Sequence, residues 1–215
     1  RGQRSAVIRA LPSGELEFDA LGLPPVLEEL CELNRGLVLV TGATGSGKST
    51  TLAAMIHRIN RTRRVHIVTV EDPIEFVHKD IKARISQREV GEDTHSFHAA
   101  LRHVVRQSPD VIMIGELRDR ETMEVALTAS LTGHLVFATL HTIDASQTLQ
   151  RMLSYFPSHL KEQAALDMSL SLQAIVSQRL VPTRGGKERA LAAEILTGSP
   201  PAKRLIQRQQ FDELY

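Results

Sequence analysis

The chain has 215 residues, of which 42% are hydrophobic and 24% are charged, an ordinary composition for a soluble globular protein with one large α/β domain. A net charge of +1 does not mark it as a general binder of polyanions, and the single cysteine, Cys31, excludes an internal disulfide and a cysteine-based zinc site. No apolar run approaches the roughly 20 residues that span a bilayer, and no signal peptide is visible. We therefore expect a cytoplasmic protein that does not insert into the membrane.

A β-hairpin is predicted near the N-terminus, where Ser5–Ala10 and Glu15–Phe18 flank a Pro-Ser-Gly turn. Because the chain opens on Arg, inside this strand pattern, we expect residues 1–22 to be the end of an upstream domain with its linker. The next helix is predicted at Pro24–Leu33, and we assign residues 23–215 to one domain.

Strand and helix patterns alternate from residue 37 onward, which predicts the α/β class. The apolar runs suit strands that are covered on both faces, namely Leu37–Thr41, Val65–Val70, Val111–Ile114 and Leu135–Leu140. Helices are predicted at Lys48–Asn60, Ser96–Gln107, Arg120–Leu131, Ala145–Leu153, His159–Ser177 and Ala202–Gln210. A second hairpin is predicted from Leu180–Thr183 and Ala190–Leu196.

The most specific motif is GATGSGKST, which follows the strand Leu37–Thr41 directly. It fits the phosphate-binding pattern G-x-x-x-x-G-K-S/T, in which glycines let backbone N–H groups curl around phosphate oxygens. The N-terminus of the following helix adds partial positive charge. We therefore predict a nucleoside triphosphate site with contacts from Gly42, Thr44, Gly45, Ser46, Gly47, Lys48, Ser49 and Thr50.

Two acidic blocks follow later strands. The segment VEDPIEF places Glu71, Asp72 and Glu75 at the carboxyl end of the second strand, where ligands sit in open α/β sheets. Carboxylates beside a polyanion are unfavourable unless they hold a metal ion or orient a water, and a hydrolytic site needs both; a solvated polar loop is the alternative. Glu116 closes the strand Val111–Ile114 at the Walker B position, which holds Mg²⁺ directly or through water.

Two histidines and three arginines complete the candidate site. His141 leaves the strand Leu135–Leu140 at its carboxyl end, where the γ-phosphate is expected, and His134 precedes that strand; a structural role is the alternative for both. A P-loop hydrolase often needs a cation from outside the loop, and the candidates are Arg106, Arg118 and Arg151. For the arginines between residues 58 and 64 we favour a structural role over nucleic-acid contact.

Together these blocks resemble the type IV pilus retraction ATPases of twitching motility (PilT/PilU-like), within the type II/IV secretion ATPase superfamily. The matching segments stand in the family's order and spacing: RGLVLVTGATGSGKSTTLAAM, VEDPIEFVH, QREVGEDT, PDVIMIGELRD and TGHLVFATLHT. The resemblance implies a RecA-like P-loop NTPase motor domain that follows a PAS-like N-terminal domain. It also implies a homo-hexamer that hydrolyses ATP with Mg²⁺.

The resemblance assigns roles position by position. Lys48 matches the lysine on the phosphates, Ser49 the hydroxyl on Mg²⁺, Glu75 the glutamate that activates water, and Glu116 the Walker B glutamate near the metal. The remaining matches are His134 and His141, which form the family's His box, and Arg106 and Arg151, which in the family reach a neighbouring subunit's nucleotide.

The implied setting is the cytoplasmic face of the inner membrane, with a pilus platform protein and a related pilus ATPase paralogue as partners. One departure is the segment AKRLIQRQ, Ala202–Gln209, where the apolar pair of the family's retraction motif has moved by one place. An accessory pilus ATPase is therefore one alternative. From other classes the alternatives are a RecA-like nucleic-acid translocase, a small-molecule kinase and a regulator without turnover. Near-neutral charge and 4% aromatic residues argue against nucleic acid.

Overall fold

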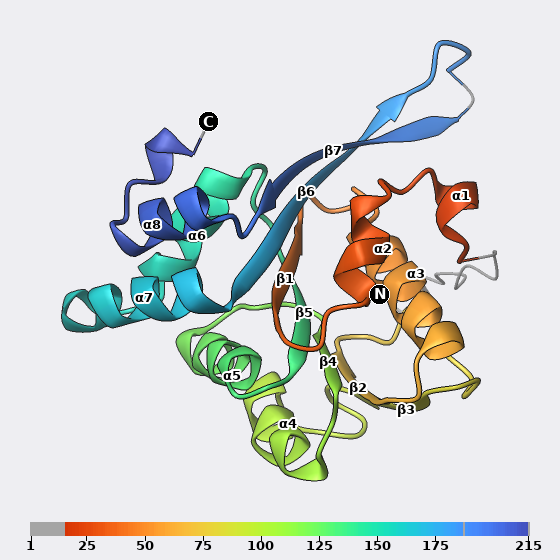
Figure 1. The fold of residues 1–215 in the computed structure, drawn as a ribbon. Helices are drawn as coiled ribbons and strands as arrows, with labels where there is room; N and C mark the ends of the chain where they lie inside the picture. The colour runs from red at the N-terminus through yellow and green to blue at the C-terminus, as the bar shows by residue number, and fades with distance from the viewer. Residues whose placement is uncertain (1–15, 187, 215) are drawn as a thin grey trace, which may run out of the picture.

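The computed structural model describes residues 16–186 and 188–214, and the descriptions below concern these residues. Their seven strands form one sheet in the order β3-β2-β4-β5-β1-β6-β7 (Figure 1). Neighbouring strands are parallel except β6 and β7, which form an antiparallel hairpin. The strands are β1 (Gly36–Thr41), β2 (His66–Glu71), β3 (Arg84–Glu89), β4 (Val111–Ile114), β5 (Leu135–Leu140), β6 (Leu172–Pro182) and β7 (Arg189–Thr197).

Helices cover both faces of the sheet, as the continuous apolar strands predict (Figure 1). One face carries α1 (Phe18–Leu21), α2 (Val26–Cys31) and α3 (Lys48–Thr62). The other carries α4 (Phe97–Val104), α5 (Arg120–Leu131), α6 (Ala145–Ser154), α7 (Lys161–Ser171) and α8 (Pro200–Gln207), with the short 3₁₀ turns η1 (Val105–Gln107), η2 (Ser158–Leu160) and η3 (Phe211–Glu213). Successive β1 side chains alternate between the two cores: Val38 and Val40 face α3, whereas Leu37 and Leu39 face the other layer.

The α/β class and most predicted elements are confirmed, including the bounds of β4, β5 and α5. The predicted helix His159–Ser177 is wrong in its last six residues, because α7 ends at Ser171 and β6 begins at Leu172. β6 pairs with β1, and this long-range pairing overrides the local helical pattern. The second hairpin is confirmed with longer strands, whereas β3 was not predicted.

The N-terminal hairpin falls mostly on residues 1–15, outside the described residues. Of its second strand, residues 16–18 are described; they form no strand, and Phe18 begins α1. Phe18 packs with Leu27 and Leu30 of α2, so its burial against α2 and α3 fixes this segment as helix. Within the described residues, no helix has the length and apolarity that a membrane crossing requires.

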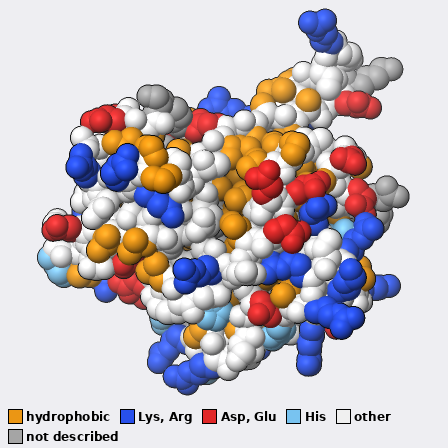
Figure 2. Space-filling model, viewed as in Figure 1, with side chains coloured by type: hydrophobic (Ala, Val, Ile, Leu, Met, Phe, Trp, Pro, Cys, Tyr) orange, Lys and Arg blue, Asp and Glu red, His pale blue; other side chains and the backbone are white. Residues whose placement is uncertain are grey.

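The arginines at the end of α3 contact neighbouring protein groups. Arg58 pairs with Glu28 at 2.7 Å, and Arg63 donates to the carbonyls of Cys31 and Leu33 at 2.8 Å. Figure 2 shows how Lys and Arg side chains gather on this side of the molecule, over the end of α3. The described contacts of Arg58 and Arg63 tie α3 to α2, as the structural interpretation of the cluster predicts.

Candidate nucleotide-binding site

The carboxyl ends of β1, β2, β4 and β5 meet at one edge of the sheet because these strands are parallel. The phosphate loop leaves β1 at this edge with φ values of 144° at Gly42, 79° at Gly45 and 90° at Gly47. A side chain at Gly42 would lie 2.4 Å from the Gln178 carbonyl oxygen of β6 and 2.5 Å from Ser46 Oγ. Glycine is therefore required at Gly42 by both conformation and space.

Lys48 begins α3, whose N-terminus has no side-chain cap, so its first N–H groups remain available to an anion. The Lys48 ammonium donates to the carbonyls of Gly42 at 2.8 Å and Ala43 at 3.0 Å, and lies 3.4 Å from His141 Nδ1. Burial lowers the pKa of Lys48, and the nearby carboxylates of Glu116 and Glu75 raise it. The lysine is thus held over the loop, where phosphate oxygens can compete with the carbonyls for it.

A cavity of about 650 Å³ opens beside this loop, large enough for a nucleotide. Most of the predicted site residues line it: Thr44, Gly45, Gly47, Lys48, Ser49, Thr50, Glu71, Asp72, Glu75, Glu116, Arg118 and His141. Ser46 is buried behind the loop, and its hydroxyl has no hydrogen-bond partner. Four separate chain segments therefore converge on one cavity.

Glu71 is an anchor inside the fold, in contrast to the solvated loop that was the alternative reading. Its carboxylate accepts hydrogen bonds from Thr69 Oγ1 at 2.7 Å and Gln87 Nε2 at 3.1 Å, and from the backbone N–H of Glu75. Burial raises the pKa of Glu71, while these three hydrogen bonds lower it. The carboxylate thus fixes the start of the turn that carries Glu75.

A chain of polar contacts crosses the cavity from the loop to Asp72. His141 Nε2 lies 3.3 Å from Glu116 Oε1, and Arg118 Nε donates to Glu116 Oε2 at 2.7 Å. Arg118 also reaches Asp72 at 3.3 Å. His141 also contacts Lys48, so groups of Lys48, His141, Glu116, Arg118 and Asp72 form one series across the space where a nucleotide fits.

The oxygen donors here fit a magnesium ion that is shared with a nucleotide. The Ser49 hydroxyl at the first turn of α3 and the Glu116 carboxylate, 19% exposed, both border the cavity. Mg²⁺ prefers oxygen ligands, keeps several waters and is usually bound by one or two protein groups together with phosphates. Ser49 and Glu116 are therefore the residues that would hold it.

Five predicted site residues do not line the cavity: Gly42 and Ser46 belong to the phosphate loop beside it, whereas His134, Arg106 and Arg151 lie elsewhere in the chain. His134 precedes β5, at the opposite edge of the sheet from His141, and its Nδ1 lies 3.0 Å from the Ala129 carbonyl oxygen. The strand between the two histidines separates them by roughly 20 Å at about 3.3 Å per residue. Arg106 lies in η1, and Arg151 on α6 stacks over the Tyr155 ring at 4.8 Å. Within one chain, the structure brings His141 and Arg118 to the nucleotide cavity, but not the last three residues.

Two glutamines support the site, although neither was predicted as a site residue. Gln87 on β3 bonds both Glu71 and the turn that carries Glu75. Gln178 on β6 donates to Thr51 of α3 at 2.8 Å, and both are buried. Gln87 belongs to a segment of the family resemblance but was not placed on a strand, and Gln178 falls between the predicted helix His159–Ser177 and the predicted strand Leu180–Thr183. A strand prediction at either place would have pointed to them.

Comparison with known proteins gives one consistent family. The family described as "Type II/IV secretion system protein" matches residues 2–209. The type IV pilus retraction ATPase PilT of Pseudomonas aeruginosa is 48% identical over 210 residues, which cover 98% of this chain and 61% of PilT. The type IV pilus ATPase PilU of the same organism is 47% identical over 208 residues, which cover 97% of this chain and 54% of PilU.

Solved structures agree with this. The crystal structure of the pilus retraction motor PilT with bound ADP is 52% identical, with a TM-score of 0.92 over 96% of this chain and 60% of that one. The ATPase DotB of Legionella pneumophila is 32% identical, with a TM-score of 0.85 over 92% of this chain and 57% of DotB. The chain spans about three-fifths of the length of these proteins. The predicted fold class and the resemblance are confirmed, and the chain belongs to the type II/IV secretion system protein family.

Proposed function

We propose that the protein hydrolyses ATP as a subunit of a motor that powers type IV pilus retraction. The observation that carries this proposal is the convergence of Lys48, Ser49, Glu75 and Glu116 on one cavity beside the phosphate loop. Phosphate-binding groups alone would serve a nucleotide-binding regulator. The two carboxylates favour hydrolysis, because an acid beside a triphosphate has to orient water or hold a metal ion.

In this mechanism the triphosphate draws Lys48 away from the loop carbonyls, and the exposed N–H groups of α3 bind its oxygens. Glu75 orients the attacking water and accepts its proton as oxygen bonds to the γ-phosphorus and the bond to ADP breaks. Ser49 and Glu116 would hold Mg²⁺, which would supply positive charge to the phosphate oxygens. His141, between Lys48 and Glu116, senses the γ-phosphate.

The assembly that we propose is a homo-hexamer, in which Arg106 and Arg151 complete the site of a neighbouring protomer. Their place outside the cavity of their own chain, on η1 and α6, agrees with such a role. His134 belongs to the same proposal, as a His-box residue at the far end of β5. Residues 23–215 would form the motor domain and residues 1–22 the end of a PAS-like domain.

The cellular setting is proposed from the relatives. PilT and PilU act in the type IV pilus by their names, so we place this protein at the cytoplasmic face of the inner membrane with a pilus platform protein. The similarity to PilU, nearly as high as that to PilT, also favours an accessory motor that works beside a paralogue. Twitching by a deletion strain separates the two: a principal motor is required for it, whereas the loss of an accessory motor leaves it partly intact.

Substitution of Glu75 tests the hydrolytic role. Glu75→Gln keeps the shape of the side chain but removes the proton acceptor, so phosphate release should fall about 10²- to 10⁴-fold. Binding of ADP should be retained, because the phosphate loop is untouched. Glu121→Gln on the exposed side of α5 is the matched control and should hydrolyse ATP normally. Normal turnover by Glu75→Gln would remove Glu75 from the mechanism.

A further inference from the structure

We propose that Gln87 is a positioning residue, which holds the turn Asp72–His78 so that Glu75 faces the nucleotide cavity. The inference rests on the proposed function, because it takes Glu75 as the group that orients water. Gln87 is partly buried on β3, next to β2, and lies opposite Thr69 in the β2–β3 register. It does not line the cavity itself and would act through the turn.

The amide of Gln87 makes three hydrogen bonds around the turn. Its Nε2 donates to the Phe76 carbonyl at 2.8 Å and to Glu71 Oε1 at 3.1 Å. Its Oε1 accepts from the backbone N–H of His78 at 2.8 Å. One side chain thus ties the residue after Glu75, and the end of the turn, to the anchor at the end of β2.

Two acidic side chains hold the other half of the turn. Glu89, two residues along β3 and on the same face as Gln87, accepts from the Ile74 N–H at 2.9 Å. Glu71 accepts from the N–H of Glu75. Side chains of β2 and β3 therefore bond the turn on both sides of Glu75, at backbone groups of residues 74, 75, 76 and 78.

The chemistry of these contacts selects an amide at residue 87. The side chain has to donate twice, to a carboxylate and a carbonyl, and accept once from an N–H, which the amide of glutamine does. A leucine of similar size makes none of these bonds. An ionised glutamate keeps the acceptor but loses both donors, and it would set a second negative charge against Glu71. Gln87→Leu and Gln87→Glu therefore separate the hydrogen bonds from the shape of the side chain.

The full-length protein provides the first test. Both Gln87 variants should lose about 10- to 100-fold in kcat, since a displacement of about 1 Å at a reacting group costs up to about 10²-fold. The ADP dissociation constant should change less than about threefold, because the phosphate loop does not contact Gln87. Ser86→Ala, on the same strand as Gln87, is the matched control. It removes a 3.3 Å contact with His66 of β2 and should keep normal kcat. Wild-type kcat in either Gln87 variant would overturn the inference, and melting temperatures show whether the variants are folded.

A double mutant distinguishes positioning from general destabilisation. In the Glu75→Gln background, Gln87→Leu should leave the residual rate unchanged, because the group that it positions is already gone. The same loss of kcat in both backgrounds would overturn the inference.

Hydrogen exchange separates this inference from the proposed function. Should Glu75→Gln hydrolyse ATP normally, the role of Glu75 fails, but the anchoring of the turn remains measurable. Faster exchange of the Ile74 and His78 amides in Gln87→Leu than in Ser86→Ala would support the anchor. Equal exchange in the two variants would overturn it.

Discussion

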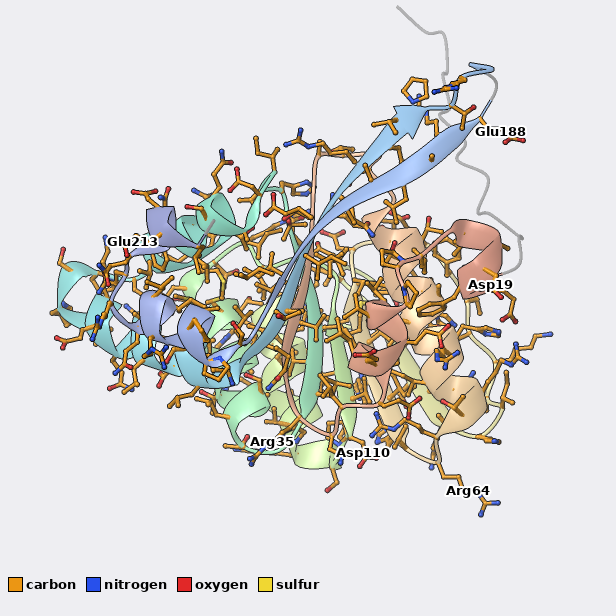
Figure 3. The ribbon with its side chains drawn as sticks, turned by 45° about the horizontal axis from the view of Figure 1, so that its top comes forward. Asp19, Arg35, Arg64, Asp110, Glu188 and Glu213 are labelled. Carbon is orange, nitrogen blue, oxygen red and sulfur yellow. The ribbon has the colours of Figure 1, made fainter. Side chains whose placement is uncertain are left out.

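The two ends of the parallel strands carry similar polar residues but use them differently. At the amino ends these residues close backbone hydrogen bonds: Asp110 accepts from the N–H of His66 at 2.8 Å, and His134 contacts the carbonyl of Ala129. Figure 3 labels Asp110 and Arg35 at this edge, where β4 and β1 begin. At the carboxyl ends, Glu116 and His141 instead contact other side chains across a cavity.

The difference follows from how each strand is connected. Before a strand, a short turn brings a polar side chain against neighbouring backbone, where it satisfies a buried N–H or C=O group. After a strand, the chain diverges into the phosphate loop and the turn Asp72–His78, which leaves space between them. Residues of the same type thus stabilise the fold at one edge and face a ligand at the other.

Loss of Lys48 should have the largest effect at the carboxyl edge. Lys48→Ala removes the only charge that contacts the loop carbonyls in the described residues, and it leaves Glu116 and His141 without that neighbour. We expect ATP hydrolysis to fall by about 10²- to 10³-fold, as for the loss of one electrostatic stabiliser, with weaker nucleotide binding. Phosphate release and titration with a fluorescent nucleotide measure the two effects. Normal hydrolysis by the variant would contradict a catalytic role for the residues at the carboxyl edge.

Much of the carboxyl edge could be predicted because local pattern and chemistry agree there. The apolar runs of β1, β4 and β5 are long enough to name a strand, and each is followed by a glycine or a charged residue at the next positions. Since parallel strands end together, Lys48, Glu75, Glu116 and His141 could be expected near one another without coordinates. The cavity confirms that expectation.

The errors come from contacts between distant segments. The stretch Leu172–Ser177 has no local signal that separates a buried strand from a helix, and its pairing with β1 decides the matter. β3 is short and polar, with Gln87 and Glu89 where an edge strand usually has solvated side chains. The His-box assignment of His134, which rests on the resemblance, stays a prediction; β5 carries this residue to the other edge of the sheet from His141.

The two histidines that flank β5 offer a matched pair for the comparison. His141→Ala should lower kcat about tenfold, equivalent to about 1.4 kcal/mol of transition-state stabilisation, because it removes the side chain that contacts both Lys48 and Glu116. His134→Ala should leave the ADP dissociation constant unchanged and lower the free energy of unfolding by about 1 kcal/mol, the value of one hydrogen bond. Steady-state kinetics measure the change in kcat, and denaturant unfolding measures the change in the free energy of unfolding. A loss of kcat in His134→Ala and a loss of stability alone in His141→Ala would contradict the proposed difference between the two edges of the sheet.

His78, at the end of the turn that carries Glu75, should make the stability of the protein depend on pH. Burial lowers the pKa of His78 to about 4, with a smaller contribution from His57, whereas the unfolded chain titrates near 6.5. Between these values the unfolded state binds a proton that the folded state does not, so the free energy of unfolding falls as the pH falls. The slope approaches about 1.4 kcal/mol per pH unit for this single proton.

Replacement of His78 isolates that contribution. In His78→Gln the free energy of unfolding should depend less steeply on pH between about 6.5 and 4, and the variant should gain stability relative to wild type as the pH falls through this range. His95→Gln, at an exposed position, is the control and should follow the wild-type slope. Parallel curves for wild type and His78→Gln would mean that the imidazole is protonated in the folded state, and that the carboxyl edge near Glu75 is more open to water than the cavity indicates.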